Sequence, residues 1–378
     1  MRFPEFQGEW EKCKLGDYGK VVTGNTPPTK NIENYENGTY LWASPADLGR
    51  IKSISETKIM LSAKGFSTTR ALPKGSVLIT CIGSTIGKTG MATKEMSTNQ
   101  QINSIVVNDN NDNEFVYYAI QSAFPRYLSS IAVQAVPIIS KSSFELLPNQ
   151  RPCLQEQKKI GKFLSLLDER IATQSKIIED LKKLKCAIIE KVYSEIQGKE
   201  YSYGQLFDVV NERNKQMEYS NILSTSQEKG MVNRDDLNLD IQFERSNINT
   251  YKIVKKGDYV IHLRSFQGGF AFSDKLGVCS PAYTILRPNS LLEYGYLSNY
   301  FTSQRFIKSL VLVTYGIRDG RSINVDEWLS MKITIPSKEH QQYIVKMIRS
   351  FERKIEDEEA YATQLSIQKQ YLLHQMFI

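Results

Sequence analysis

Apolar residues recur in alternating steps of four and three along two long stretches of the chain. The first stretch has its apolar positions at Ile160, Leu164, Leu167, Ile171, Ile178, Leu181, Ile188 and Val192. Steps of this size place the side chains on one face of an α-helix, as in the seam of a coiled coil. Gln174 and Lys185 are the polar interruptions of this seam.

The second stretch repeats the first at an offset of 184, and its interruptions, Glu358 and Lys369, keep the same register. Its apolar positions are Ile344, Ile348, Phe351, Ile355, Ala362, Leu365, Leu372 and Met376. Neither 162–197 nor 339–378 contains glycine or proline, so each is predicted to form one helix of about 33 residues or more, about 50 Å long. We expect the helices to pair as an antiparallel coiled coil. Two separate amphipathic helices, each docked on its own globular domain, are the alternative.

The rest of the chain predicts two globular domains of the α+β class. Short runs rich in β-branched and aromatic residues, bounded by Gly, Pro, Asn or Asp, predict strands at 77–82, 102–107, 259–263, 283–286 and 331–335. Segments 115–124 and 292–306 are predicted to be short helices. The predicted division is therefore a domain at 1–153, a helix at 154–198, a second domain at 199–337 and a second helix at 338–378.

The two halves of the chain are copies of one module. FELLPNQRPCLQEQKKI, from Phe144 to Ile160, aligns with WLSMKITIPSKEHQQYI, from Trp328 to Ile344, at an offset of 184. KGSVLI (74–79) aligns with KGDYVI (256–261) at an offset of 182, and Gly87 aligns with Gly269 in that register. Gly16 pairs with Gly204 at an offset of 188. Two long copies of one unit, rather than a short-period solenoid, account for this pattern.

Composition narrows the classes of function. The 48 Lys and Arg residues exceed the 41 Asp and Glu residues, and the net charge of +7 weakly favours an anionic partner. Five scattered cysteines without a CxxC pair, and only three histidines, predict a reducing cytoplasmic location and no metal site. Apolar runs such as 77–82 are far too short to span a membrane, so we expect no membrane association.

Two motifs resemble catalytic sites without matching them. GSTIGKT (83–89) has three residues between its glycines where a phosphate-binding loop has four, and its counterpart at 263–269 lacks the GK pair. A polar turn after a buried strand is the preferred interpretation, and a nucleotide-binding enzyme using this loop is the alternative. SPAY (280–283) lacks the second proline of the adenine-methylating tetrapeptide. We therefore expect no catalytic residues in this chain.

Polar, basic and aromatic loop residues are the candidates for DNA contacts, because Arg and Lys donate to guanine, Gln bridges adenine, and Ser, Thr and Lys reach phosphates. In the first copy they are Thr26, Lys30, Trp42, Ser44, Lys64, Thr68 and Arg70, together with Ser84, Thr85 and Lys88 of the 83–89 turn. In the second copy they are Arg264, Gln267, Tyr283, Tyr315, Arg318, Asp319 and Arg321. Taken singly, such residues are more often ordinary solvated loop residues.

The chain has a duplication, two KG-plus-strand blocks, and helices introduced by PCLQEQKKI and PSKEHQQYI. With these features, the whole chain resembles the specificity subunit of a Type I restriction–modification system. The resemblance implies two variable target-recognition domains separated by conserved helices. Each domain would read one half of a bipartite, asymmetric sequence in double-stranded DNA. The helices would set the spacing and dock the methylation subunits, which bring S-adenosylmethionine, and the restriction subunits, which bring ATP and Mg.

The resemblance implies a DNA-recognition subunit that carries no cofactor of its own. Two similar but non-identical domains would read two different half-sites, and a rod of about 50 Å corresponds to roughly one to one and a half turns of B-DNA between them. Two alternatives remain open at this point. One is the specificity component of a related single-complex restriction enzyme, and the other is a coiled-coil adaptor whose lobes bind protein.

Overall fold

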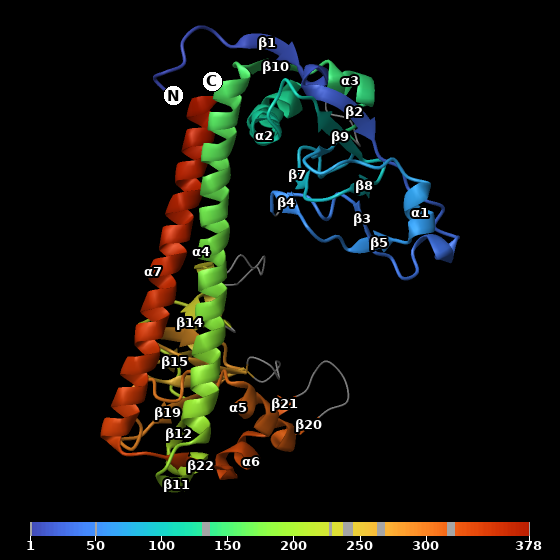
Figure 1. The fold of residues 1–378 in the computed structure, drawn as a ribbon. Helices are drawn as coiled ribbons and strands as arrows, with labels where there is room; N and C mark the ends of the chain where they lie inside the picture. Colours follow the sequence, from blue (N-terminus) through green and yellow to red (C-terminus); the bar gives the residue numbers. More distant parts are fainter. Residues whose placement is uncertain are drawn as a thin grey trace. The chain divides into compact units, whose positions relative to one another are not determined.

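The computed structural model describes residues 2–49, 51–130, 137–226, 229–236, 245–262, 269–315 and 322–377. The chain forms two compact units, one of Met1–Lys176 with Ala360–Ile378 and the other of Ile177–Glu359. Each unit contains one globular domain and a part of each of two long helices, α4 (Leu154–Ser194) and α7 (Lys338–Met376) (Figure 1). The prediction of two α+β domains with two long helices is confirmed, while the four-part division at the stated boundaries stays a prediction.

The first domain is built on a five-stranded sheet with the spatial order β2-β9-β6-β7-β4. Its strands are β2 (Gly19–Thr23), β4 (Ser53–Ile54), β6 (Val77–Thr80), β7 (Thr89–Ala92) and β9 (Ile102–Val107). A smaller sheet, β5-β3-β8, contains β3 (Tyr40–Ala43), β5 (Ile59–Leu61) and β8 (Met96–Thr98), and β1 (Glu11–Lys14) pairs antiparallel with β10 (Pro148–Arg151). The helices are α1 (Ala63–Ser67), α2 (Asn113–Ser130) and α3 (Lys141–Glu145).

Strand β6 lies between two apolar cores of the first domain. Val77 and Ile79 pack into the core that includes α2, while Leu78 belongs to a second core with Leu41 and Leu48. A strand buried on both faces has no solvent side, so its sequence, VLIT, is continuously apolar up to Thr80 instead of alternating. Burial on both faces therefore accounts for the apolar run of this central strand.

The second domain repeats this plan with the sheet order β12-β19-β16-β17. These strands are β12 (Phe207–Val210), β16 (Tyr259–Ile261), β17 (Phe270–Phe272) and β19 (Thr284–Pro288). The two-stranded pairs are β11 (Lys199–Ser202) with β22 (Lys332–Ile335), β13 (Leu223–Ser226) with β14 (Gly230–Asn233), β15 (Lys252–Val254) with β18 (Gly277–Cys279), and β20 (Thr314–Tyr315) with β21 (Ser322–Ile323). The helices are α5 (Gln304–Ser309) and α6 (Val325–Ser330).

The strand order shows the duplication directly, because β12-β19-β16-β17 corresponds to β2-β9-β6-β7. The two KG blocks lead into the central strands β6 and β16. Gly75 and Gly257, the glycines of those blocks, have φ of +85° and +96°. A residue with a Cβ is strained in that conformation, so the turn before each central strand needs glycine.

The helices α4 and α7 run antiparallel within each unit, in agreement with the prediction (Figure 1). In the first unit Asp168 pairs with Lys369, and Arg170 bonds to Tyr361; in the second, Lys182 pairs with Glu359, and Lys185 with Glu352. The apolar seam positions predicted on both helices are all buried or half-buried, whereas Leu166, Ile177 and Ile367 are exposed.

The two lysine interruptions of the seam form equivalent ion pairs. Lys369 Nζ lies 2.6 Å from Asp168 Oδ1 in the first unit, and Lys185 Nζ lies 3.0 Å from Glu352 Oε1 in the second. Lys185 and Lys369 occupy equivalent positions of the two copies, as do Asp168 and Glu352. The duplicated sequence therefore supplies each helix with one cation and one anion for the other.

The alternative of helices docked on their own domains also describes part of the structure. Ile160 and Leu164 belong to the main core of the first domain, and Ile344 and Ile348 belong to that of the second. The opposite ends of the helices contribute as well. Met376 and Phe377 lie in the first core, and Ile189 and Tyr193 lie in the second. The seam is thus continuous with both domain cores.

The helix predicted at 292–306 is wrong for most of its length, because only Gln304–Ser309 is α-helical. Leu292, Tyr296, Leu297 and Phe301 are buried and have helical spacing, which explains the error. Gly295 has φ of +76°, and the N–H groups of Tyr296 and Ser298 donate to residues three positions back. The segment is therefore a series of turns. The other predicted helix, 115–124, lies inside the longer α2.

Removal of the Lys369 charge should destabilise the protein more than removal of the Lys185 charge. The side chains of Lys369 and Asp168 are 16% and 18% exposed, against 25% and 35% for Lys185 and Glu352. Lys369→Met leaves a carboxylate that is largely removed from water, at a cost of about 1–3 kcal/mol, whereas Lys185→Met should cost about 0–1 kcal/mol. Urea unfolding followed by circular dichroism measures both values, and the reverse order would contradict the expectation.

Candidate nucleic-acid interface

Asn25 brings several of the predicted DNA-contacting residues together in the first domain. Its Nδ2 donates to the carbonyl of Thr68 at 2.9 Å, and its Oδ1 accepts the N–H of Arg70 at 3.1 Å. Its own N–H donates to the Thr98 carbonyl, and its carbonyl accepts the indole N–H of Trp42 at 3.1 Å. The loop after β2, the end of α1 and the strands β3 and β8 are therefore joined at one asparagine.

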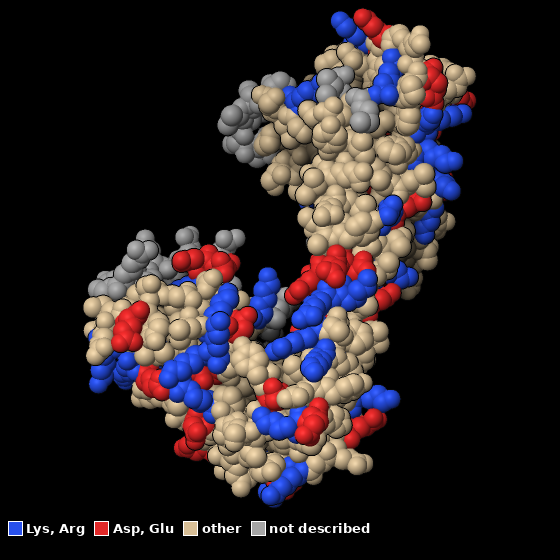
Figure 2. Space-filling model, turned by 90° about the vertical axis from the view of Figure 1, so that its left-hand side faces the viewer, with Lys and Arg blue, Asp and Glu red and all other residues tan. Residues whose placement is uncertain are grey.

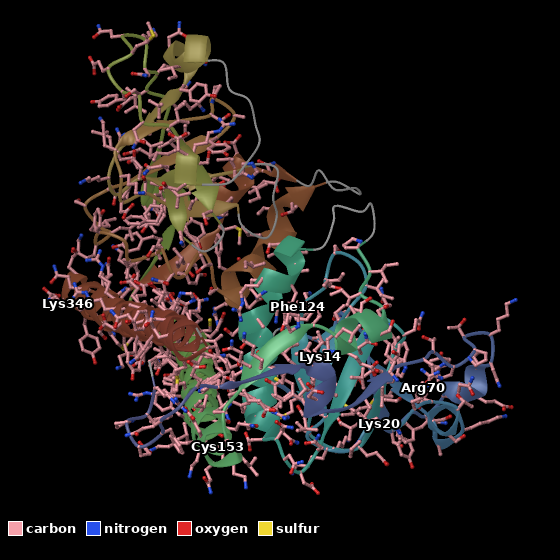
Figure 3. The ribbon with its side chains drawn as sticks, turned by 90° about the horizontal axis from the view of Figure 1, so that it is seen from above. Lys14, Lys20, Arg70, Phe124, Cys153 and Lys346 are labelled. Atoms are coloured by element: carbon pink, nitrogen blue, oxygen red, sulfur yellow. The ribbon has the colours of Figure 1, made fainter. Side chains whose placement is uncertain are left out.

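Arg70 and Thr26 lie in this same loop cluster. The Arg70 guanidinium donates to the carbonyl of Thr23 at the end of β2 at 2.6 Å, and the Thr26 hydroxyl donates to the side chain of Gln100. Figure 3 shows Arg70 and the exposed Lys20 of β2 on the same side of the first unit. Lys30 is exposed nearby in the loop after β2. The cluster thus places cationic side chains beside amide and hydroxyl side chains, the residue types that can contact phosphates and base edges.

Lys64 lies on α1 and bonds to the carboxylate of Glu33, which lowers the pKa of the Glu33 carboxyl.

Trp42 does not belong to the set of loop residues that the sequence predicts for it. It lies on β3, is 6% exposed, and donates its indole N–H to Asn25. Its apolar bulk fills the space between strand and loop, so it supports the loop instead of facing a ligand.

A second group of predicted residues lies on two neighbouring turns of the first domain. Ser44 bonds to Asp47 through its N–H at 2.9 Å and its hydroxyl at 2.7 Å. A Cβ at Gly49 would lie 3.0 Å from Lys88 Cγ, so this turn and the 83–88 turn touch. Ser84 and Lys88 are exposed, and Thr85 is half-buried.

The 83–88 segment connects β6 to β7 as a hairpin. The N–H of Gly87 donates to the Thr80 carbonyl at 3.0 Å, and the N–H of Lys88 donates to the Thr85 carbonyl at 3.2 Å. A phosphate-binding loop presents its N–H groups at the start of a helix, whereas this segment leads into a strand. The geometry therefore disfavours the nucleotide-binding alternative and agrees with the polar turn preferred from the sequence.

In the second domain, Tyr283 is the predicted residue whose side chain is described. It is half-buried, its ring contacts His262 edge-on at 5.0 Å, and its carbonyl accepts a bond from Lys252 Nζ at 2.8 Å. Burial lowers the pKa of Lys252. Arg264, Gln267, Arg318, Asp319 and Arg321 lie outside the described residues, as does the side chain of Tyr315. The assignment of all these residues to DNA contact stays a prediction.

Asn25 and Gln100 are the members of the loop cluster that sequence reasoning missed. The segment GNTPP (24–28) predicts a turn. An asparagine in a turn, however, gives no indication that its side chain bonds to residues far away in the sequence. Gln100 lies in TNQQ (98–101), a segment without a recognisable motif. Both residues become visible only when α1 and the turn after β8 are brought beside the loop.

Three further observations concern the described residues. Lysine and arginine are interspersed with aspartate and glutamate on the face shown in Figure 2. Across the described ranges, no three His, Cys, Asp or Glu side chains are grouped in a way that could hold a metal ion. Over the same ranges, every helix is too short or too polar to cross a bilayer.

Comparison with known proteins gives matches along the chain. The family model described as the Type I restriction modification DNA specificity domain matches twice, over residues 7–183 and 198–365. The specificity subunit of type I restriction enzyme MjaIX from Methanocaldococcus jannaschii is 28% identical over 209 residues. That match includes 53% of this chain and 48% of the relative, so the chain spans about half the length of that protein.

Two solved structures share the fold. The S subunit of the Type-I restriction-modification system from M. genitalium is 16% identical with a TM-score of 0.57, over 98% of this chain and 96% of that chain. A chain from work on complex assembly and conformational transition of the type I R-M system is 15% identical with a TM-score of 0.62, over 97% of each chain. Both likenesses extend over the two domains and both long helices.

Proposed function

Because the chain belongs to the Type I restriction modification DNA specificity domain family, we propose that it is the DNA-recognition subunit of a Type I restriction–modification complex. Each globular domain reads one half of a bipartite, asymmetric site in double-stranded DNA. The observation that carries this proposal is the repeated fold, since β2-β9-β6-β7 and β12-β19-β16-β17 are the same sheet with different loops. Two similar scaffolds with different loops suit two different half-sites.

In this proposal α4 and α7 set the distance between the half-sites and dock the methylation and restriction subunits. S-adenosylmethionine, ATP and Mg belong to those partner subunits, and this chain contributes no catalytic residue. The hairpin geometry of the 83–88 turn supports the absence of a nucleotide site in that segment. The loop cluster around Asn25, with Arg70, Thr26 and Gln100, supports a reading surface on the first domain.

The test is selection of DNA by the purified chain from a library of duplexes with a randomised central region. We expect sequencing of the bound fraction to yield two short, different, fixed sequences separated by an unread spacer of constant length. Binding should weaken steeply as salt rises, because phosphate contacts release counterions. Enrichment of one continuous or palindromic sequence would contradict two independent half-site readers, and salt-independent retention would favour a protein-binding adaptor.

The isolated chain should show no turnover of its own. Incubation of the purified chain and target duplex with radiolabelled S-adenosylmethionine or with ATP should transfer no methyl group and release no phosphate above the no-protein blank. ATP hydrolysis that copurifies with the chain and is lost in Lys88→Ala would restore the nucleotide-binding alternative. Lys30→Ala, a change of another exposed lysine in the same domain, is the matched control.

A further inference from the structure

Two buried glutamines hold the first turn of each long helix to its domain. Gln157 on α4 and Gln341 on α7 are each 1% exposed and occupy equivalent positions of the duplicated motif, in QEQ and EHQ. Glutamine is rarely buried unless its polar atoms are bonded, because an unpaired amide in a core costs free energy. Both side chains must therefore be satisfied where they lie.

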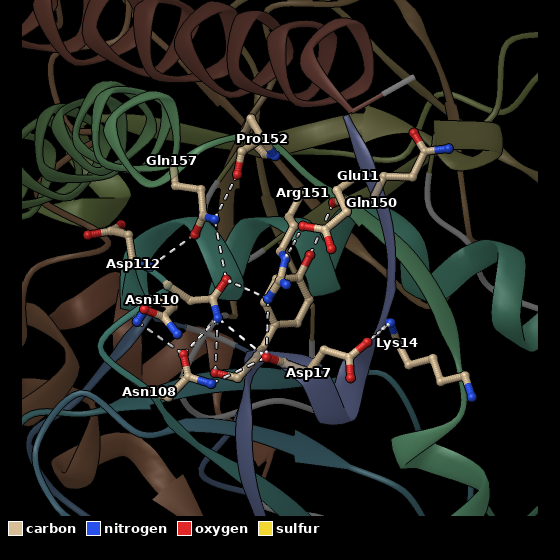
Figure 4. A network of polar contacts seen from close by, with 12 residues as sticks. Glu11, Lys14, Asp17, Asn108, Asn110, Asp112, Gln150, Arg151, Pro152 and Gln157 are labelled. Carbon is tan, nitrogen blue, oxygen red and sulfur yellow. Dashed lines mark hydrogen bonds and ion pairs between the residues drawn. The ribbon is translucent and has the colours of Figure 1, made fainter. Parts of the chain in front are cut away.

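The two amides make equivalent hydrogen bonds. Gln157 Oε1 accepts the N–H of Asp112 at 3.0 Å, and its Nε2 donates to the Pro152 carbonyl at 3.0 Å and to Asn111 Oδ1 at 3.3 Å (Figure 4). Gln341 Oε1 accepts the N–H of Glu293 at 2.7 Å. Its Nε2 donates to the carbonyls of Pro336 at 3.1 Å and Leu291 at 3.0 Å.

Each glutamine therefore joins three parts of one unit. The proline carbonyl belongs to the segment that leads into the helix, and Pro152 and Pro336 are again equivalent positions of the two copies. Asn111–Asp112 and Leu291–Glu293 follow the strands β9 and β19, which occupy equivalent places in the two sheets. The amide is thus the point at which the helix, its leading segment and the central sheet of the domain are fixed to one another.

Packing at the first glutamine leaves little freedom for another arrangement. A Cβ on Gly161, one turn further along α4, would lie 2.5 Å from Asp112 Oδ1 and 2.8 Å from the backbone nitrogen of Phe115. The helix approaches the start of α2 this closely because residue 161 is glycine. Around Gln157 the polar contacts extend through Asn111 to Arg151 and Glu11 (Figure 4), whereas in the second unit Lys338 donates to the Leu292 carbonyl at 2.7 Å. The neighbours differ between the units, and the glutamine is common to both.

We infer that Gln157 and Gln341 are positioning residues that fix the orientation of each DNA-reading domain on its helix, and so determine how strictly one spacer length is required. This inference rests on the proposed function. Neither side chain is assigned a contact with DNA. Their effect is on geometry: a domain that can rock on its helix still recognises its half-site but accepts half-sites at more than one distance.

The experiment repeats the selection from randomised duplexes with the full-length chain carrying Gln157→Met, Gln341→Met, or Gln155→Met as control. Methionine has nearly the length of glutamine and none of its hydrogen bonds, and Gln155 is an exposed residue on the same turn. For the first two variants we expect both half-site sequences unchanged and the preference for the wild-type spacer over spacers one base pair longer or shorter reduced about tenfold. The control should keep the wild-type preference.

Hydrogen exchange by NMR or mass spectrometry gives a second readout that does not depend on DNA. Gln157→Met should lose protection at the Asp112 N–H and keep it at the Glu293 N–H, and Gln341→Met should do the reverse. If one variant fails to fold, the other tests the inference in the other unit. A narrow, wild-type spacer in a folded variant with lost protection would overturn the positioning role alone. Failure of the wild-type chain to select any sequence would overturn the proposed function, and the inference with it.

Discussion

Leu164→Asp should prevent stable folding of the first unit. Leu164 is fully buried on α4, where the helix seam meets the core of the first domain. Loss of its side chain from such a core costs about 2–5 kcal/mol, and an unpaired carboxylate in the same place costs several kcal/mol more. The sum is comparable with the entire stability of a typical domain, about 5–15 kcal/mol. We expect the variant to be insoluble, or to show no cooperative melting transition by circular dichroism.

Leu166→Asp is the matched control, because it makes the same chemical change two residues further along the same helix. Leu166 is 53% exposed, so its replacement removes little buried apolar surface and leaves the new carboxylate in water. Its melting temperature should lie within a few degrees of the wild-type value, since exposed substitutions usually cost less than about 0.5 kcal/mol. Equal destabilisation by the two variants would show that burial along the seam does not decide stability.

Insertion of four residues into both long helices should lengthen the unread spacer of the DNA site. Suitable points follow Lys176 in α4 and Ala360 in α7, which are equivalent positions of the two copies and lie where the two units divide. Four helical residues add about 6 Å and slightly more than one turn, so the seam stays nearly in phase. At about 3.4 Å per base pair, we expect one or two extra base pairs in the selected site, with both half-sites unchanged.

Insertion into α4 alone separates a change of length from a disturbance of pairing. The ion pairs Asp168–Lys369 and Lys185–Glu352 lie on opposite sides of the insertion point in α4, so the two helices could no longer form both in one register. We expect this variant to be less stable and to select DNA poorly. A paired insertion that leaves the spacer unaltered would show that the helices do not determine the distance between half-sites, even if both half-sites are still read.

The elements that the sequence predicted well are those whose signal is periodic or repeated. The seam residues could be predicted because apolar steps of four and three place the side chains on one face of a helix. The second copy repeats the same positions at an offset of 184, which supports each of them independently. The Lys185 and Lys369 interruptions were visible as polar breaks, but their partners were not, because Asp168 and Glu352 read as ordinary residues of a solvated helix face. Pairing across the two helices becomes apparent only once their register is known.

The loop cluster could not be predicted to the same extent. The sequence favours a loop position for Trp42, but the residue is buried on β3, because its contact with Asn25 has no local signature. Likewise, the turns at 292–303 have the apolar spacing of a helix, and Gly295 interrupts it. The burial of Trp42 depends on a non-local contact, and the turns at 292–303 depend on backbone conformation. Hydrophobic periodicity reports neither of these.

The packing of Met376 and Phe377 into the first domain has a consequence for synthesis of the protein. The Phe377 ring lies 5.7 Å from that of Trp10 and 5.4 Å from that of Phe115, so residues from distant parts of the chain share one core. On the ribosome, the first domain emerges long before these residues do. Its core stays open while the second domain is made, because closing it requires contacts with Met376 and Phe377, which lie more than 200 residues further along the chain. The nascent chain therefore exposes apolar surface of the first domain until the end of α7 has been made, and chaperone protection matters most during that interval.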